Sequence, residues 1–66
     1  MSVKLSSIDN ELMVKIYSAK ARGVQVFTLS AISANSLARL ISSGFAQDIN
    51  GFAYLTDKGL KKVKKL

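Results

Sequence analysis

The chain has 66 residues, and ten Lys and Arg side chains against four Asp and Glu give it a net charge of +6. It contains no Cys, His, Pro or Trp, which excludes a disulfide framework, a zinc site of the usual kind and hydrolases that activate a serine with a histidine. Since 48% of the residues are apolar, we expect residues 1–66 to fold as one small domain and not to remain a disordered polycation.

The first predicted element is an α-helix over about residues 7–22. Ile8, Leu12 and Ile16 recur at helical spacing, which places them on one apolar face. Serines precede this segment and can cap its first turn, and acidic side chains follow within that turn, where the helix dipole favours negative charge. Gly23 is expected to end the helix.

Residues 24–28 read Val-Gln-Val-Phe-Thr, a short β-branched and aromatic run that predicts a strand. The segment that follows, up to residue 43, contains neither Gly nor Pro. It permits two interpretations. One is a single-turn helix at residues 29–33 followed by a second helix from near Asn35, and the other is one continuous helix over about residues 30–43.

Residues 45–56 predict a β-hairpin. Asn50 and Gly51 separate two short apolar runs, and both residue types tolerate the positive φ that a type I′ turn requires. Thr56 or Asp57 can then cap a final, Lys-rich helix. The predicted fold is therefore α+β, in the order helix, strand, helix or helices, hairpin, helix.

Two short motifs lie in the second half of the chain. Residues 40–45 read Leu-Ile-Ser-Ser-Gly-Phe, and residues 55–59 read Leu-Thr-Asp-Lys-Gly. With the hairpin between them they resemble part of a winged-helix (winged helix-turn-helix) DNA-binding domain, in which a recognition helix ends in Leu-x-x-x-Gly, a two-stranded wing follows, and Leu-Thr-x-x-Gly opens the next helix. The similarity covers about residues 37–63. Upstream, the sixteen residues from 28 to 43 are few for the two helices and the turn that the family usually has there.

The resemblance implies that the helix before Gly44 enters the major groove of double-stranded DNA. Leu37, Leu40 and Ile41 would face the core, so that polar residues of this helix point outward. Arg pairs with guanine, Asn with adenine and Ser with several bases. The residues expected to read bases are Asn35, Ser36, Arg39 and Ser42.

Basic side chains are expected to contact DNA phosphates, and four to six such contacts would give a log–log salt slope of roughly −4 to −5. They are Lys15, Lys20, Arg22, Lys58, Lys61 and Lys62. The wing is expected to contribute less: Asn50 could donate a hydrogen bond, Gly51 serves the turn, and Asp48 would repel phosphate.

The sequence therefore predicts a small basic protein that binds double-stranded DNA, a transcriptional regulator of the compact kind encoded by phages, plasmids or archaea. Such a protein would be cytoplasmic and associated with the nucleoid, and it could act as a homodimer. The alternative is a protein-interaction module, or an inhibitor of a host nucleic-acid enzyme, with the same fold. The acidic wing tip and the presence of one base, Arg39, on the reading helix favour that alternative.

Catalysis, a cofactor, a metal and a membrane are not expected. Asp9 and Glu11 diverge on their helix, because residues two apart do not face each other, and the glycine spacing fits no phosphate-binding or dinucleotide-binding loop. No apolar run approaches the ~20 residues of a membrane-spanning helix. The five Phe and Tyr side chains are expected mainly in the core.

Overall fold

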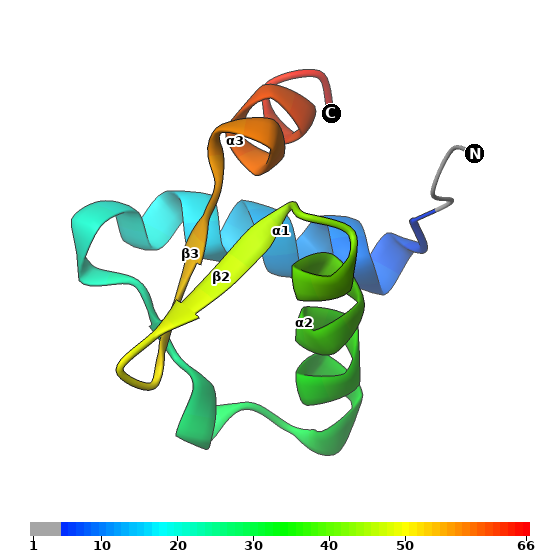
Figure 1. Cartoon of the computed structure of the whole chain (residues 1–66). Helices are drawn as coiled ribbons and strands as arrows, with labels where there is room; N and C mark the ends of the chain where they lie inside the picture. Colours follow the sequence, from blue (N-terminus) through cyan, green and yellow to red (C-terminus); the bar gives the residue numbers. More distant parts are fainter. Residues whose placement is uncertain (1–4) are drawn as a thin grey trace.

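Three α-helices and three short strands follow one another along the part of the chain that the computed structural model describes, residues 5–66 (Figure 1). The strands pair as one antiparallel sheet in the order β1-β3-β2, so the fold is α+β, as predicted. The elements are α1 (Ser7–Ala19), the 3₁₀ turn η1 (Lys20–Arg22), β1 (Val24–Gln25), the 3₁₀ turn η2 (Val26–Thr28), α2 (Ala31–Ser42), β2 (Ala46–Ile49), β3 (Phe52–Leu55) and α3 (Asp57–Val63).

Helix α1 begins with a capping box. The Ser6 hydroxyl accepts a hydrogen bond from the Asp9 N–H, and the Asp9 carboxylate accepts one from the Ser6 N–H. The helix ends at Ala19, before the predicted end at residue 22, because Lys20 has a φ of 54° and leaves the helical conformation. Lys20 begins η1, and Gly23, also at positive φ, leads into the sheet.

The strand predicted at residues 24–28 is shorter in the structure. β1 has two residues, which pair with β3. The Val26 N–H still donates to the Gly51 carbonyl at the hairpin turn (2.9 Å), but the Thr28 hydroxyl donates back to the Gln25 carbonyl (2.8 Å). The chain therefore leaves the sheet early and places η2 beside the tip of the hairpin.

Helix α2 is one continuous helix, which decides between the two interpretations of residues 29–43. The Ser30 hydroxyl caps its start by accepting a hydrogen bond from the Ser33 N–H (3.2 Å), and the helix then runs without a break to Ser42. The single-turn helix at residues 29–33 is not formed. The short turn before α2 is η2, which lies further upstream.

Strands β2 and β3 form the predicted hairpin. Ile49 pairs with Phe52 next to the turn. Asn50 and Gly51 have φ values of 53° and 86°, so both are positive, as a type I′ turn requires. Both are exposed. The Asp48 carboxylate accepts a hydrogen bond from the Gly51 N–H (3.0 Å) and so stabilises the turn.

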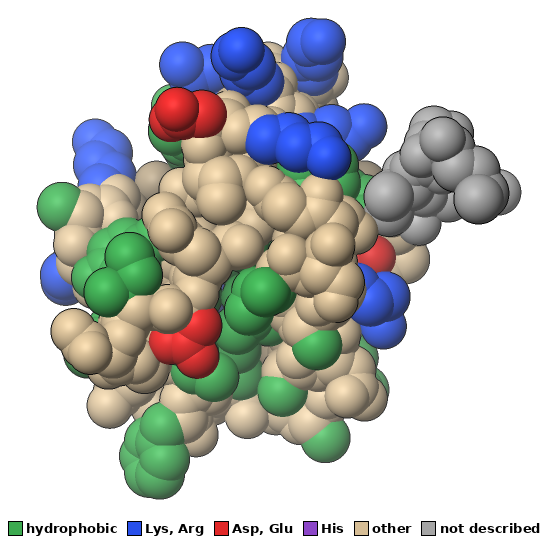
Figure 2. All heavy atoms as spheres, in the orientation of Figure 1, with side chains coloured by type: hydrophobic (Ala, Val, Ile, Leu, Met, Phe, Trp, Pro, Cys, Tyr) green, Lys and Arg blue, Asp and Glu red, His purple; other side chains and the backbone are tan. Residues whose placement is uncertain are grey.

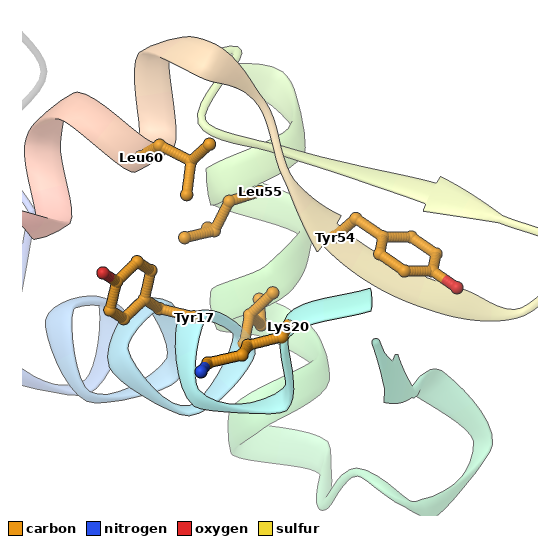
Figure 3. A pocket seen from close by; sticks show the side chains of 6 residues that line it. Tyr17, Lys20, Tyr54, Leu55 and Leu60 are labelled. Atoms are coloured by element: carbon orange, nitrogen blue, oxygen red, sulfur yellow. The ribbon is translucent and has the colours of Figure 1, made fainter. Parts of the chain in front are cut away.

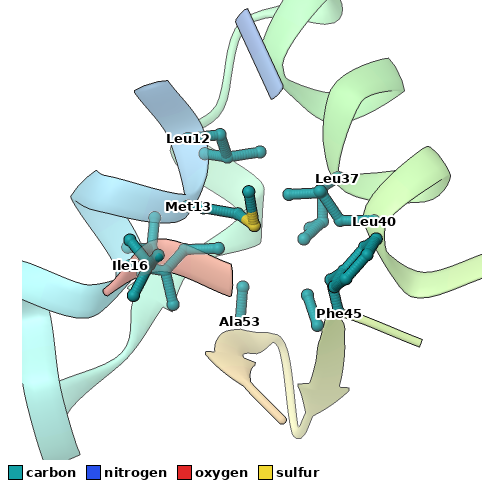
Figure 4. Packing of buried hydrophobic residues seen from close by; sticks show 10 residues of the cluster. Leu12, Met13, Ile16, Leu37, Leu40, Phe45 and Ala53 are labelled. Atoms are coloured by element: carbon teal, nitrogen blue, oxygen red, sulfur yellow. The ribbon is translucent and has the colours of Figure 1, made fainter. Parts of the chain in front are cut away.

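The core lies between α1, α2 and the sheet, with α3 closing one end (Figure 4). Its buried hydrophobic residues are Leu12, Met13, Ile16, Val24, Leu37, Leu40, Phe45, Ala46, Ala53 and Val63. Burial of Leu37 and Leu40 confirms the predicted inner face of α2, but the prediction for Ile41 is wrong, since this residue is 40% exposed. Ile41 lies about 100° further round the helix than Leu40, which carries it past the buried face.

Helix α3 approaches the backbone just before β2 very closely. The Thr56 hydroxyl accepts a hydrogen bond from the Gly59 N–H (3.1 Å) and donates one to the Gly44 carbonyl (2.5 Å). Gly59 is buried, and a Cβ at this position would lie 2.0 Å from the Phe45 carbonyl oxygen. The Leu-Thr-x-x-Gly motif therefore has a structural reason: its Thr caps α3, and its Gly allows the close approach.

Candidate nucleic-acid interface

Ser36, one of the residues predicted to read bases, is fully buried. Its hydroxyl donates a hydrogen bond to the Asp9 carboxylate of α1. The prediction is wrong for this residue, because the side of α2 that carries Ser36 faces α1 and not the solvent. Ser36 is four positions before Leu40 and next to Leu37, so helical spacing places it near the inner face of α2, but its partner Asp9 is 27 positions away in the sequence.

Arg39 is paired with the same carboxylate. Its Nη2 lies 2.8 Å from Asp9 Oδ1, and its Nε lies 3.2 Å from Oδ1 and 3.3 Å from Oδ2. The side chain is 52% exposed, but Nε and Nη2 face the carboxylate and are not available for a bidentate contact with guanine. The geometry gives Arg39 the role of holding α2 on α1.

Ser6, Asp9, Ser36 and Arg39 form a polar cluster between the two helices, which we call the Asp9 cluster. The hydrogen bonds from Arg39 hold the pKa of Asp9 well below its usual value; those from Ser36 and Ser6 act in the same direction, and burial opposes them. Asp9 in turn raises the pKa of Arg39. The carboxylate therefore stays ionised at neutral pH and is a constant acceptor for both side chains.

The face of α2 that points away from the core carries small, uncharged side chains. Ala31, Asn35, Ala38 and Ser42 recur at steps of four and three, and all four are exposed; we call them the outer stripe. Asn35 and Ser42 are the two predicted base-reading residues that lie on it. Because Arg39 is the charged residue of α2 and is paired with Asp9, the outer stripe offers hydrogen-bonding groups without a free charge.

Basic side chains gather on α3 and around the end of α1. Figure 2 shows Lys and Arg side chains over α3, whereas the lower part of the same face, over the hairpin tip and the start of α2, shows none. Besides Lys58, the predicted phosphate contacts that are exposed and lie on these two elements or on η1 are Lys15, Lys20, Arg22, Lys61 and Lys62.

Lys58, also predicted to contact phosphate, makes contacts within the fold. Its Nζ donates a hydrogen bond to the Ser43 carbonyl (2.9 Å) and lies 4.7 Å from the centre of the Phe45 ring. A cation at the carboxyl end of a helix also interacts favourably with the helix dipole. Lys58 therefore fixes the end of α2 from the first turn of α3.

The tip of the hairpin and the neighbouring turn η2 carry exposed apolar side chains. Ile49 and Phe52 face each other across the last strand pair, and both are exposed. Phe27 in η2 is 88% exposed. We call these three residues the apolar tip. The five Phe and Tyr side chains were expected mainly in the core, and this is wrong for three of them. Phe45 is buried and Tyr54 is half-buried, but Tyr17, Phe27 and Phe52 are exposed, Phe27 because the chain leaves the sheet before this position.

Within residues 5–66, no helix is long and apolar enough to cross a bilayer, and no three acidic side chains are arranged to hold a metal ion. The chain was compared with protein-family models, with curated proteins and with solved structures, and none of the three comparisons found a match.

Proposed function

We propose that the protein binds double-stranded DNA as a small winged-helix-like regulator of transcription, with α2 in the major groove and the β2–β3 hairpin as the wing. The observation that carries this proposal is the outer stripe of α2, which is exposed along the whole helix while the opposite face is used by the core and by α1. Short side chains allow a helix to enter the groove closely, and Asn and Ser can hydrogen-bond to base edges. The order of the elements supports the same interpretation.

Contacts to bases and to phosphates would come from different parts of the molecule. Asn35 and Ser42 contact bases, and the exposed Lys and Arg side chains of α1, η1 and α3 contact phosphates. Arg39 and Lys58 are positioning residues in this proposal. Arg39 fixes the side of α2 on α1, and Lys58 fixes its carboxyl end.

The proposal is tested by fluorescence anisotropy with labelled duplexes, first with a random pool at low salt and then with a sequence selected from that pool. Asn35→Ala is expected to weaken binding to the selected sequence by about 1–3 kcal/mol and to relax the preference at one base pair. Lys62→Ala is the matched control and should weaken binding to all duplexes alike. If no duplex binds at low salt, the proposal is overturned.

A second candidate function, a protein-interaction module, is favoured by the apolar tip. Large apolar side chains exposed together on a small protein are typical of a surface that binds another protein, and a partner enzyme acting on nucleic acid or a second copy of this chain would both qualify. Phe27→Ser should abolish self-association in sedimentation equilibrium, or recovery of a stoichiometric partner in a pull-down. Val14→Ser, which replaces an exposed apolar residue of α1, is the control. Equal behaviour of the two variants would exclude the apolar tip as the interface.

A further inference from the structure

A cavity of about 300 Å³ lies between the end of α1, strand β3 and helix α3 (Figure 3). It shares no residue with the outer stripe of α2 or with the apolar tip. In Figure 3, Tyr17, Leu55 and Leu60 surround a common space, with Lys20 along one edge. The lining residues are Ile16, Tyr17, Lys20, Tyr54, Leu55 and Leu60.

The lining combines an apolar interior with one positive charge. Leu, Ile and Tyr side chains supply the apolar surface, and Lys20 supplies the ammonium group. None of the described residues that line the cavity is acidic, so the cavity itself offers this ammonium group no carboxylate. A mostly apolar pocket with one polar anchor is the usual form of a small-molecule site. Charge complementarity favours a ligand with an apolar body and one anionic group.

The backbone of Lys20 gives a second, independent reason to consider this site. Within residues 5–66, Lys20 and Asn50 are the non-glycine residues at positive φ. Asn50 belongs to the hairpin turn, where Asn is favoured, but a Lys at φ 54° and ψ −131° is in a conformation that residues with a Cβ rarely adopt. Such strained residues concentrate at binding sites. Hydrogen bonds from the Lys20 N–H to the Tyr17 carbonyl, and from the Gly23 N–H to the Lys20 carbonyl (3.2 Å), hold this conformation.

We propose that this cavity binds a small monocarboxylic acid with an apolar body. The carboxylate pairs with Lys20 Nζ at the edge, and the hydrocarbon lies among Tyr17, Leu55 and Leu60. A dry cavity of about 150 Å³ holds one benzene molecule, so a cavity of about 300 Å³ fits a chain of roughly eight carbons. The proposal does not depend on DNA binding, because it uses none of the groups that would read bases; of the groups proposed to contact phosphates, it uses Lys20.

The intrinsic fluorescence of the protein reports directly on this site, since the chain has two Tyr and no Trp and both Tyr line the cavity. Titration with octanoate is expected to change the Tyr fluorescence saturably, with one molecule bound per chain. 1-Octanol, which lacks the charge, should bind at least about tenfold more weakly, and octylammonium should bind more weakly still. Equal affinity for octanoate and octanol, or no saturable change with octanoate, would overturn the proposal.

Lys20→Gly is the decisive variant, because it removes the ammonium group and also relieves the strained backbone, so it should remain folded. Its affinity for octanoate is expected to fall about tenfold, to that of the wild-type protein for octanol. Lys62→Gln on α3 is the matched control, since it removes an exposed charge that does not line the cavity. It should keep the wild-type affinity. An equal loss of affinity in both variants would mean that octanoate binding depends only on the net charge of the protein. This result would refute the proposed site, whatever the result with DNA.

Discussion

Asp9 accepts hydrogen bonds from residues before α1 and on α2, although it is almost fully buried. The sequence places an acidic residue in the first turn of a helix, where the dipole favours it. It does not show that the same carboxylate also anchors Ser36 and Arg39. A buried carboxylate is tolerated only when donors surround it, so the residues of the Asp9 cluster depend on one another.

Asp9→Asn is expected to destabilise the fold by about 2 kcal/mol, because Arg39 and Ser36 lose their charged acceptor. Glu11→Gln is the matched control. It removes an exposed carboxylate from the same helix and should change the free energy of unfolding by less than about 0.5 kcal/mol. Urea unfolding followed by circular dichroism measures both values, and similar values for the two variants would contradict the anchoring role of Asp9.

The same carboxylate makes the stability of the fold depend on pH in the acid range. Because the hydrogen bonds from Arg39 hold the pKa of folded Asp9 below the 3.8 of the free residue, the unfolded chain takes up a proton first as the pH falls. The contribution of Asp9 is therefore fully present above a pH of about 4 and is lost progressively as the pH falls toward the folded pKa. Urea unfolding at a series of acid pH values should show this loss in the wild-type protein and not in Asp9→Asn. If Asp9→Asn lost the same free energy of unfolding as the wild-type protein over this pH range, the contribution of Asp9 would be disproved.

Lys20→Gly is expected to stabilise the fold by about 1 kcal/mol, because glycine adopts positive φ without the steric cost that lysine carries. Lys15→Gly is the contrasting variant: Lys15 lies inside α1, and glycine should destabilise a helix interior by about 1 kcal/mol. The midpoints of urea unfolding give the signs of both changes. If Lys20→Gly instead destabilised the fold, the contacts of the Lys20 side chain in the unliganded protein would contribute more free energy than the strained backbone of Lys20 costs.

At the scale of the elements, the packing of α3 explains a motif that the sequence could only match by resemblance. Gly59→Ala places a Cβ 2.0 Å from the Phe45 carbonyl oxygen, which forces α3 away from the backbone. We expect a loss of about 3 kcal/mol, seen in thermal unfolding as a fall in Tm of more than about 10 °C.

Gly51→Ala separates this steric effect from the effect of backbone conformation. Gly51 has a φ of +86°, but within the described part of the chain no heavy atom lies within 4 Å of the position that a Cβ would occupy, so alanine should cost only about 1 kcal/mol. If Gly59→Ala is as mild as Gly51→Ala, then α3 does not pack on the Phe45 backbone as tightly as the structure indicates.

At the scale of the whole molecule, the face in Figure 2 carries Lys and Arg side chains over α3 and none over the hairpin tip, while α1 carries both exposed cations and exposed apolar side chains such as Val14 and Tyr17. If Lys15, Lys20, Arg22, Lys61 and Lys62 each neutralise one phosphate, the logarithm of the DNA-binding constant should fall with the logarithm of salt concentration with a slope of about −4 to −5. Replacing both Lys61 and Lys62 by Ala should bring this slope about 2 closer to zero, while Phe27→Ser should leave it unchanged. Anisotropy titrations at several salt concentrations measure the slopes, and a slope near zero would exclude phosphate contacts by these residues.

Much of the fold could be predicted from local patterns. The start of α1, the hairpin with its Asn50-Gly51 turn and the Thr56 cap each depend on residues within a few positions of one another, and all three are present in the structure. The end of α1 and the length of β1 were less well predicted. In both places, hydrogen bonds within a 3₁₀ turn replace those of the regular element.

The sequence by itself determined the α+β class, the order of the elements and the excess of positive charge, because these follow from composition and from short-range spacing. Only the tertiary structure decided which polar side chains of α2 remain available to bind a partner. Ser36 and Arg39 are not available, because they donate hydrogen bonds to Asp9, which lies 27 and 30 positions away in the sequence. A helical pattern identifies the inner face of a helix, but it does not say which residue of another element lies opposite that face. The exposure of Phe27 and the cavity at Lys20 were decided in the same way, because each depends on segments that meet only when the chain has folded.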